Sequence, residues 1–491
     1  MKMGLASVGK RKSGEHSASG SRLQPSRGFR LPRRLWKVRL CIALACLALN
    51  AAGKDLKLIT LDPGHFHAAL FQQERLAGVA DTAWVYAPLG PDLAAHLNRV
   101  TKFNLRRDNP TRWKLEVRTG PDFFDRMLAE RRGDLVVISG RNRGKIDRIG
   151  AIVGNRLHVL ADKPWIIELA DLPKLSGTLD LAEKKRVAVW DAMTERFEIT
   201  FLLQRALVND PDIFGGRITG SVDEPAVHIE STHYLFKEVG GLPNLRPTWF
   251  FDIRQQGEGL TDVGTHLVDI VPWILFPEQA LNCTKDIQVL SGTRWPTTLT
   301  FEQFKRVTGV GEFPDFLRES MTAGSLPYFC NNTVSYTMRG VHVKLEVKWD
   351  FEAPPSVKDN DLAVFRGGTS RVEVRQGRDQ NYRREVYVVP NRSEQQTTVL
   401  AAVSQRVKAL QTDYPGLDVR DEPGGIRLEI PERFRVSHEE HFALVVRRFL
   451  EYVHHPKLVP AWEKPNLLAK YYVTTLGVQL ARQNQATTPD P

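Results

Sequence analysis

An unbroken apolar run in the first third of the chain most constrains the fold. Residues Leu135–Ile138 read Leu-Val-Val-Ile between Asp134 and Ser139. A strand without polar–apolar alternation is buried on both faces, which is typical of the centre of a parallel sheet. Helical patterns separate it from further predicted strands at 56–61, 82–86, 114–117, 157–160 and 187–190. This alternation predicts an α/β domain with a doubly wound parallel sheet over residues 54–195.

The pattern changes after about residue 197. Residues Val341–Trp349 alternate apolar and polar, and Arg339-Gly340 before them is typical of a two-residue hairpin turn. Other short strands are predicted near 216–221, 226–231, 334–338, 362–365, 370–375 and 385–389, and helices at about 439–452 and 467–482. We therefore expect an α+β domain with a mostly antiparallel sheet over residues 196–482, followed by a loose tail at 483–491.

The formal charge of +11 lies almost entirely in the first 53 residues. These hold eleven Lys and Arg and one acidic residue, whereas the remainder holds 57 basic and 56 acidic residues. The main body therefore gives no electrostatic reason to expect nucleic-acid binding.

The basic segment has the layout of an export signal. Arg33-Arg34 precedes an apolar run at 40–49, which is too short to span a bilayer, and Ala51-Ala52-Gly53 resembles a cleavage site. The arginine pair resembles a twin-arginine signal, with a plain Sec signal as the alternative. We expect residues 1–53 to be removed and the mature protein to be periplasmic or extracellular, without a membrane span. Cys283 and Cys330 then remain, and the sequence leaves open whether they pair.

Two short segments carry the candidate chemistry. Pro164 follows Lys163 directly after a predicted strand, and strand ends are where α/β folds place their ligands. Asp262, His266 and Asp269 are spaced i, i+4 and i+7, which predicts one helix face with a carboxylate one turn from the histidine. Lysine, histidine and carboxylate together predict a proton-transfer site.

With these motifs the chain resembles the glucose–fructose oxidoreductase / inositol dehydrogenase / rhizopine catabolism (Gfo/Idh/MocA) family. The family turn His-Val-Leu-x-Glu-Lys-Pro appears here as residues 158–164, and the family motif Asp-x-Gly-x-His-x-x-Asp appears intact at 262–269. The resemblance implies a Rossmann domain, bound NAD or NADP, and hydride transfer at a sugar or polyol carbon. It implies Lys163 and His266 as catalytic residues, with Asp262 as the acid that orients His266.

The dinucleotide turn departs from the family pattern. Where Gly-x-Gly-x-x-Gly is expected, the chain reads Asp62-Pro63-Gly64-His65-Phe66-His67, and only the middle glycine remains. We still expect the cofactor here, on the residues of this turn and of the two strand-end turns near it: Gly64, His65, Phe66, His67, Ser139, Arg141, Asn142, Asp162 and Lys163. A helix at 68–76 is expected to direct its N-terminus at the pyrophosphate.

The pair His65 and His67 also permits a metal site like that of a hydrolase barrel. No later predicted strand ends in a suitable His or Asp, so no metal is predicted. Trp249, Asp252 and Asp269 are expected to line the substrate pocket.

The sequence thus predicts an exported NAD(P)-dependent oxidoreductase acting on a sugar, polyol or glycoside hydroxyl, with a tightly held, recycled cofactor. The alternatives are redox-assisted glycoside cleavage and a non-catalytic sugar-binding protein on a Rossmann frame. The expected partners are a small carbohydrate and further copies of the chain, joined through the C-terminal sheet.

Overall fold

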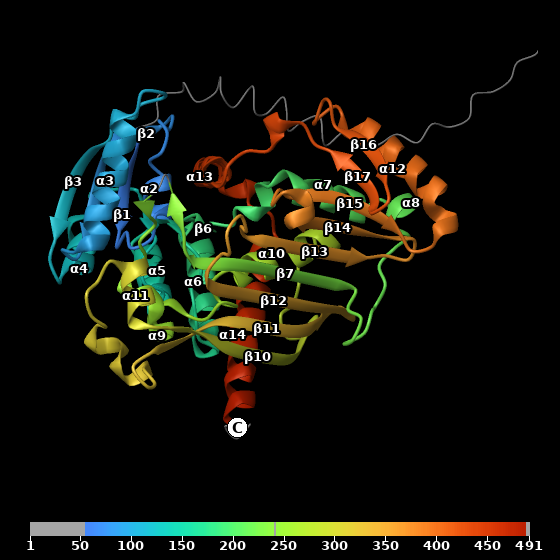
Figure 1. Ribbon diagram of the computed structural model, residues 1–491. Coiled ribbons are helices and arrows are strands. Elements are labelled where there is room, and N and C mark those ends of the chain that lie inside the picture. The colour runs from blue at the N-terminus through green and yellow to red at the C-terminus, as the bar shows by residue number, and fades with distance from the viewer. Residues whose placement is uncertain (1–54, 240–241, 488–491) are drawn as a thin grey trace, which may run out of the picture. The chain divides into compact units, whose positions relative to one another are not determined.

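The apolar runs form one parallel sheet in the computed structural model, which describes residues 55–239 and 242–487 (Figure 1). The strand order β3-β2-β1-β4-β5-β6 is that of dinucleotide-binding Rossmann domains, and every neighbouring pair is parallel. The predicted fold of this half is therefore confirmed. The strands are β1 (Leu56–Leu61), β2 (Val79–Ala87), β3 (Lys114–Thr119), β4 (Leu135–Ile138), β5 (His158–Ala161) and β6 (Val189–Asp191).

The helix after β1 is much shorter than predicted. The expected helix at 68–76 is reduced to the four residues of α2 (His67–Leu70). The carbonyl of Gln72 accepts a hydrogen bond from the Trp113 indole at 2.8 Å, and the carbonyl of Gln73 accepts one from the Arg106 guanidinium. Side chains from the segment around α3 thus take carbonyls that a continuing helix would use. The other helices of this half are α3 (Pro91–Leu105), α4 (Phe123–Glu130), α5 (Lys145–Gly154) and α6 (Leu172–Lys185).

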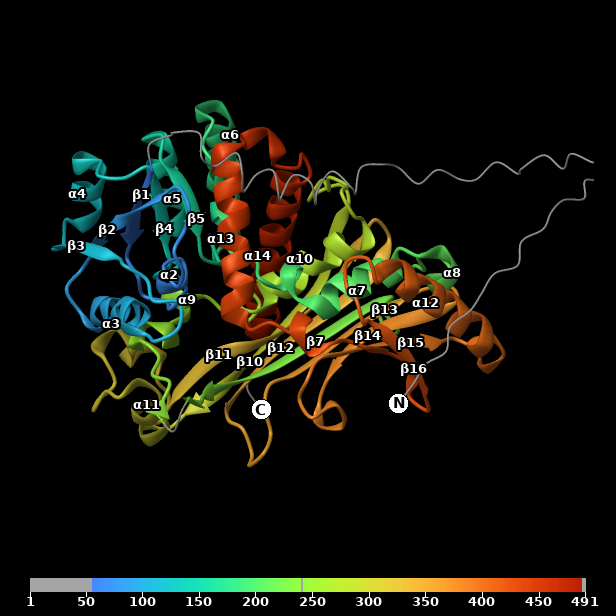
Figure 2. The same ribbon diagram turned by 90° about the horizontal axis from the view of Figure 1, so that it is seen from above.

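A helix from the far end of the chain covers the sheet where α2 is too short. Helix α13 (His438–His454) lies beside the parallel sheet (Figure 2). Phe442 and Phe449 on this helix pack in one buried cluster with Leu58 of β1 and Val137 of β4. Helix α14 (Glu463–Thr487) adds Tyr471, whose hydroxyl accepts from the Trp165 amide at 3.0 Å. The C-terminal residues therefore belong to the core of the first sheet as well as the second.

The second half forms a nine-stranded sheet of order β10-β11-β12-β7-β13-β14-β15-β17-β16. All its neighbouring pairs are antiparallel except β12 and β7, as expected for a mostly antiparallel sheet. Arg339 and Gly340 join β11 to β12 with φ of 49° and 80°, which confirms the hairpin turn. The strand predicted at 216–221 is wrong, because only isolated bridges form at Arg217 and Gly220.

The bounds of the remaining strands are β7 (Val227–Phe236), β10 (Ile287–Leu299), β11 (Leu326–Met338), β12 (Val341–Glu352), β13 (Asn360–Arg366), β14 (Ser370–Gln376), β15 (Glu385–Pro390), β16 (Asp418–Glu422) and β17 (Gly425–Glu429), with a separate pair β8 (Glu238–Val239) and β9 (Leu242–Pro243). The remaining α-helices are α7 (Ile199–Val208), α8 (Pro211–Phe214), α9 (Ile253–Gln256), α10 (Gly264–Leu275), α11 (Phe301–Thr308) and α12 (Gln396–Leu410).

Residues 1–53, where the export signal is predicted, lie outside the described residues. Among the described residues, no helix has the length and apolar character needed to cross a membrane. Cys283 and Cys330 both carry free thiols, so the pairing that the sequence left open is not formed.

The packing of α13 can be tested by truncating its buried aromatic residue. Phe449→Ala is expected to lower the free energy of unfolding by about 3–5 kcal/mol, because Phe449 is fully buried against the parallel sheet. The control Leu458→Ala, at a position 53% exposed just after the helix, should change it by less than about 0.5 kcal/mol. Urea titration of both variants measures this difference. Equal losses would mean that α13 does not support the sheet.

Candidate active site

A cavity of about 1040 Å³ lies at the carboxyl ends of the parallel strands and reaches the nine-stranded sheet. Four strand-end turns supply its first wall, those that follow β1, β2, β4 and β5. Ligands of open α/β sheets bind at this edge. The cavity is lined on that side by Gly64, His65, Phe66, His67, Leu89, Asp92, His96, Arg99, Gly140, Arg141, Asn142, Asp162 and Lys163.

Lys163 and Asp262 form the ion pair that joins the two halves at this cavity. The Lys163 ammonium donates to the Asp262 carboxylate, and each side chain is only 11% exposed. The Lys163–Pro164 peptide is cis. Burial alone would lower the pKa of Lys163, but the carboxylates of Asp262 and Asp162 outweigh burial and raise it. Lys163 is therefore a charged hydrogen-bond donor facing the cavity.

Asp262 does not hold His266 as predicted. Helix α10 begins at Gly264, so Asp262 precedes the helix, and its side chain pairs with Lys163. The buried Nδ1 atom of His266 has no hydrogen-bond partner among the described residues. Burial, and then the charge of Lys163, hold the pKa of His266 well below its ordinary value. The ring is thus neutral and able to accept a proton.

Two of the expected substrate residues lie away from the cavity. Asp269 forms buried ion pairs with Arg196 at 2.6 Å and Lys470 at 3.1 Å. Asp269, the residue at the i+7 position, therefore contacts Lys470 of α14 and does not line the cavity. Asp252 caps α9 by accepting from the amide of Arg254 at 3.0 Å. Both expectations are corrected, because these carboxylates have structural partners.

Trp249 lines the cavity as expected, but it lies beside the turn after β1, where the dinucleotide was expected. Its indole donates to the Asp92 carboxylate at 2.8 Å, and the Arg141 guanidinium lies over the ring at 5.5 Å. A Cβ atom added to Gly64 would lie 2.9 Å from the Trp249 ring. Trp249 therefore covers Gly64, the residue at which the phosphates of a dinucleotide would approach the protein backbone.

The first residue of the turn is also occupied by internal contacts. Asp62 is buried, and its carboxylate pairs with Arg148 at 2.7 Å and with Arg141 at 3.7 Å. Its charge is thus compensated by arginines. The Asn142 amide donates to the Gln256 carbonyl at 2.7 Å, and its side-chain oxygen accepts from Lys145 at 2.6 Å. Gly64, Arg141 and Asn142 all line the cavity, and Asn142 also ties the β4 turn to α9.

His65 and His67 converge on Asp162. The carboxylate lies 2.7 Å from His65 Nδ1 and 2.9 Å from His67 Nδ1, and it accepts from the Ser139 hydroxyl at 2.9 Å. His67 Nε2 lies 2.9 Å from Nε2 of His438, the first residue of α13. His438 was not expected at the site, because only a Ser-x-x-Glu capping box marks that position in the sequence. Phe66 packs against both His65 and His67, whose rings also contact each other, and lies under Arg99.

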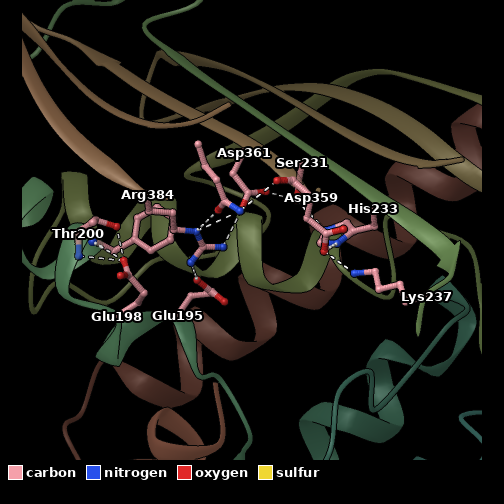
Figure 3. A network of polar contacts seen from close by, with 11 residues as sticks. Glu195, Glu198, Thr200, Ser231, His233, Lys237, Asp359, Asp361 and Arg384 are labelled. Atoms are coloured by element: carbon pink, nitrogen blue, oxygen red, sulfur yellow. Dashed lines mark hydrogen bonds and ion pairs between the residues drawn. The ribbon is translucent and has the colours of Figure 1, made fainter. Parts of the chain in front are cut away.

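A network of polar side chains forms the opposite wall (Figure 3). Arg384 binds Glu195 at 2.6 Å and Asp361 at 2.7 Å. Asp361 in turn accepts a hydrogen bond from Ser231, which contacts His233 at 2.7 Å. The network continues through Asp359 to Lys237, and Trp349 lies beside His233 with ring centroids 4.8 Å apart. Nothing in the sequence pattern distinguishes these residues from ordinary strand positions.

Comparison with known proteins gives the family. A family model described as "Putative oxidoreductase C terminal domain" matches residues 203–482. A crystal structure titled a "putative oxidoreductase" from Parabacteroides merdae is 40% identical, with a TM-score of 0.86 over 88% of this chain and 99% of that chain. The chain belongs to this oxidoreductase family. A search of curated proteins finds no match.

More distant structures share the fold. GenD2 from gentamicin A biosynthesis, in complex with NAD, is 11% identical with a TM-score of 0.53 over 88% of this chain and 95% of that chain. KijD10, a 3-ketoreductase from Actinomadura kijaniata with NADP, is 12% identical with a TM-score of 0.52 over 87% and 97%. The fold is therefore that of the Gfo/Idh/MocA oxidoreductases, as the two sequence motifs implied.

A buried histidine in the cavity wall makes stability depend on pH. Burial lowers the pKa of His96 from 6.5 to about 4, and neither ring nitrogen has a partner among the described residues. Between pH 7 and 5 the unfolded chain takes up a proton at His96 and the folded chain does not. Stability should therefore fall by about 2 kcal/mol over this interval on account of His96.

The variant His96→Leu removes this titration. Its free energy of unfolding should fall by about 2 kcal/mol less than that of the unmodified protein between pH 7 and pH 5, measured by urea titration at both pH values. An identical loss in both proteins would show that His96 titrates alike in the folded and unfolded states.

Proposed function

We propose that the protein is an NAD(P)-dependent oxidoreductase that acts on a hydroxyl of a sugar, polyol or glycoside. The observation that carries the proposal is the grouping of Lys163, Asp262 and His266 on one cavity that extends to the turn after β2. A charged donor and a neutral proton acceptor at one site suit the interconversion of an alcohol and a carbonyl. Nicotinamide, when bound, accepts or returns the hydride at the carbon that bears this oxygen.

The roles of the side chains follow from their charges. His266, held neutral by burial and by Lys163, accepts the proton of the substrate hydroxyl. Lys163 donates a hydrogen bond to the same oxygen and stabilises the negative charge that develops there. Asp262 positions Lys163 through their ion pair.

The two ends of the cavity carry residues that suit a dinucleotide, and the Trp249 side chain covers the stretch between these ends. Arg99 and Gly90 line the end beyond β2, and Lys163 lines the other end. Trp249 covers Gly64 between these ends, so a dinucleotide fits once this indole moves aside. Gly64, Arg99 and Arg141 are then the residues that would hold the phosphates, by backbone approach and by positive charge.

The far wall supports a carbohydrate as substrate. Trp349 and Phe250 offer ring faces, and Arg384, Asp361 and Ser231 offer hydrogen-bonding groups. Apolar faces with a few convergent polar groups are the usual composition of small-molecule sites. We further propose that copies of the chain associate through the nine-stranded sheet.

The position of Trp249 favours a second candidate function. If the indole remains on Gly64, the chain binds a carbohydrate without cofactor, either as a non-catalytic binding protein or with acid–base chemistry alone. Redox-assisted glycoside cleavage remains the variant of the first proposal in which the same site oxidises its substrate transiently. Titration calorimetry with NAD and NADP separates the two candidates, and Trp249→Ala should bind the dinucleotide more tightly than the unmodified protein.

The role of His266 predicts a large kinetic effect. His266→Ala should reduce turnover by roughly 10²–10⁴-fold while cofactor affinity stays within about threefold, because the ring moves a proton and does not hold the phosphates. Turnover is followed by nicotinamide absorbance on sugar and polyol substrates, and affinity by calorimetry. His342→Gln, on β12, is the matched control and should retain full turnover. Normal turnover in His266→Ala would return this histidine to a structural role.

Export is proposed from the sequence alone. Mature protein isolated from the native cells should begin near Lys54 and be found outside the cytoplasm, as read by intact-mass measurement of each cell fraction. A cytoplasmic protein that retains residues 1–53 would overturn this proposal.

A further inference from the structure

The turn that replaces the dinucleotide loop gathers ligand atoms suited to a metal ion. One ring nitrogen each of His65 and His67 and one carboxylate oxygen of Asp162 lie within 4.8 Å of one another. The histidines come from the end of β1 and the aspartate directly follows β5. No metal was predicted from the sequence, because no later predicted strand was followed by a suitable His or Asp. Asp162 is such a residue, since the parallel strands β1 and β5 end at the same edge of one sheet.

The buried carboxylate of Asp162 has its nearest basic side chains in the same two histidines. Asp162 is 5% exposed, and within 4.0 Å of its side chain the described residues supply only the two imidazoles as basic partners. Buried carboxylates in proteins are paired with a cation or coordinate a metal. A divalent ion held between the two imidazoles and this carboxylate would meet that requirement.

The surrounding residues orient this set as they do in known metal sites. His67 is 3% exposed, and its second nitrogen lies 2.9 Å from His438 Nε2, which can fix the tautomer that leaves Nδ1 unprotonated toward Asp162. Ser139 donates to the Asp162 carboxylate at 2.9 Å. His65, with a side chain 36% exposed, lines the cavity and gives an ion a route of entry.

We infer that His65, His67 and Asp162 bind one divalent transition-metal ion, Zn²⁺ or Fe²⁺. Two histidines and one carboxylate with open positions are a known ligand set for catalytic Zn²⁺ and for Fe²⁺. His65 Nδ1 lies 2.7 Å from Oδ2 of Asp162 and His67 Nδ1 lies 2.9 Å from Oδ1, and bond lengths of about 2.0–2.2 Å to one shared ion are compatible with these separations. His65, His67 and Asp162 line the cavity that Lys163 and His266 also line, so a substrate oxygen can reach this site.

The site is tested with Co²⁺ and Zn²⁺ on the full chain, after removal of any affinity tag and treatment with chelator. One Co²⁺ per chain should bind and give visible d–d absorption bands, and Zn²⁺ should displace it. His65→Gln and Asp162→Asn should each weaken Co²⁺ binding at least tenfold, since even the loss of an outer-shell partner costs 10–100-fold. The control His342→Gln removes a histidine outside the site and should bind as the unmodified protein does.

These titrations contain no nucleotide and no substrate, so their outcome is independent of the proposed oxidoreductase activity. His65→Gln is the safer variant because this side chain is partly exposed, and near-parallel urea unfolding curves verify that it folds. Failure of the unmodified protein to bind Co²⁺ or Zn²⁺ would overturn the site. Equal Co²⁺ affinity in the unmodified protein and in both variants would also overturn it, and would leave the cluster as a hydrogen-bonded turn.

Discussion

The ion pair between Lys163 and Asp262 is the contact on which the candidate site depends. Lys163 follows a strand of the parallel sheet, and Asp262 precedes the helix α10 of the second half. Both side chains are almost buried, so each charge needs the other. The pair also keeps Lys163 charged and, through that charge, helps to keep His266 neutral. This contact therefore helps both to hold the two halves in register and to set the protonation of the site.

The turn after β1 shows how residues far along the chain shape the candidate site. Its helix is reduced to four residues, and α13 from the end of the chain supplies the missing apolar cover. The same helix brings His438 to His67. The packing of α13 thus shapes the chemistry of the turn, because it adds a third imidazole beside the two that contact the buried Asp162 carboxylate.

The two walls of the cavity differ in what they offer a ligand. The strand-end wall carries the groups that can move protons, and the sheet wall carries rings and a network of paired charges (Figure 3). In that network nearly every carboxylate meets a cation, as Asp361 meets Arg384. Paired charges are fixed in position, so this wall is suited to recognise hydroxyl groups by geometry more than by net charge.

The sequence by itself determined the parallel sheet, the mostly antiparallel sheet and the C-terminal helices, and it singled out Lys163 and His266 as candidate residues that line one cavity. These follow from apolar periodicity and from motifs that are continuous in the chain. The partner of Asp262, the structural role of Asp269, the place of Trp249 on Gly64 and the approach of His438 to His67 were decided by tertiary structure. The physical reason is that each of these contacts joins segments far apart in the chain. In addition, a spacing of i, i+4 or i+7 places residues on one face of a helix only where the helix is formed. Asp262 lies before that helix begins, and the predicted helix after β1 ends within one turn.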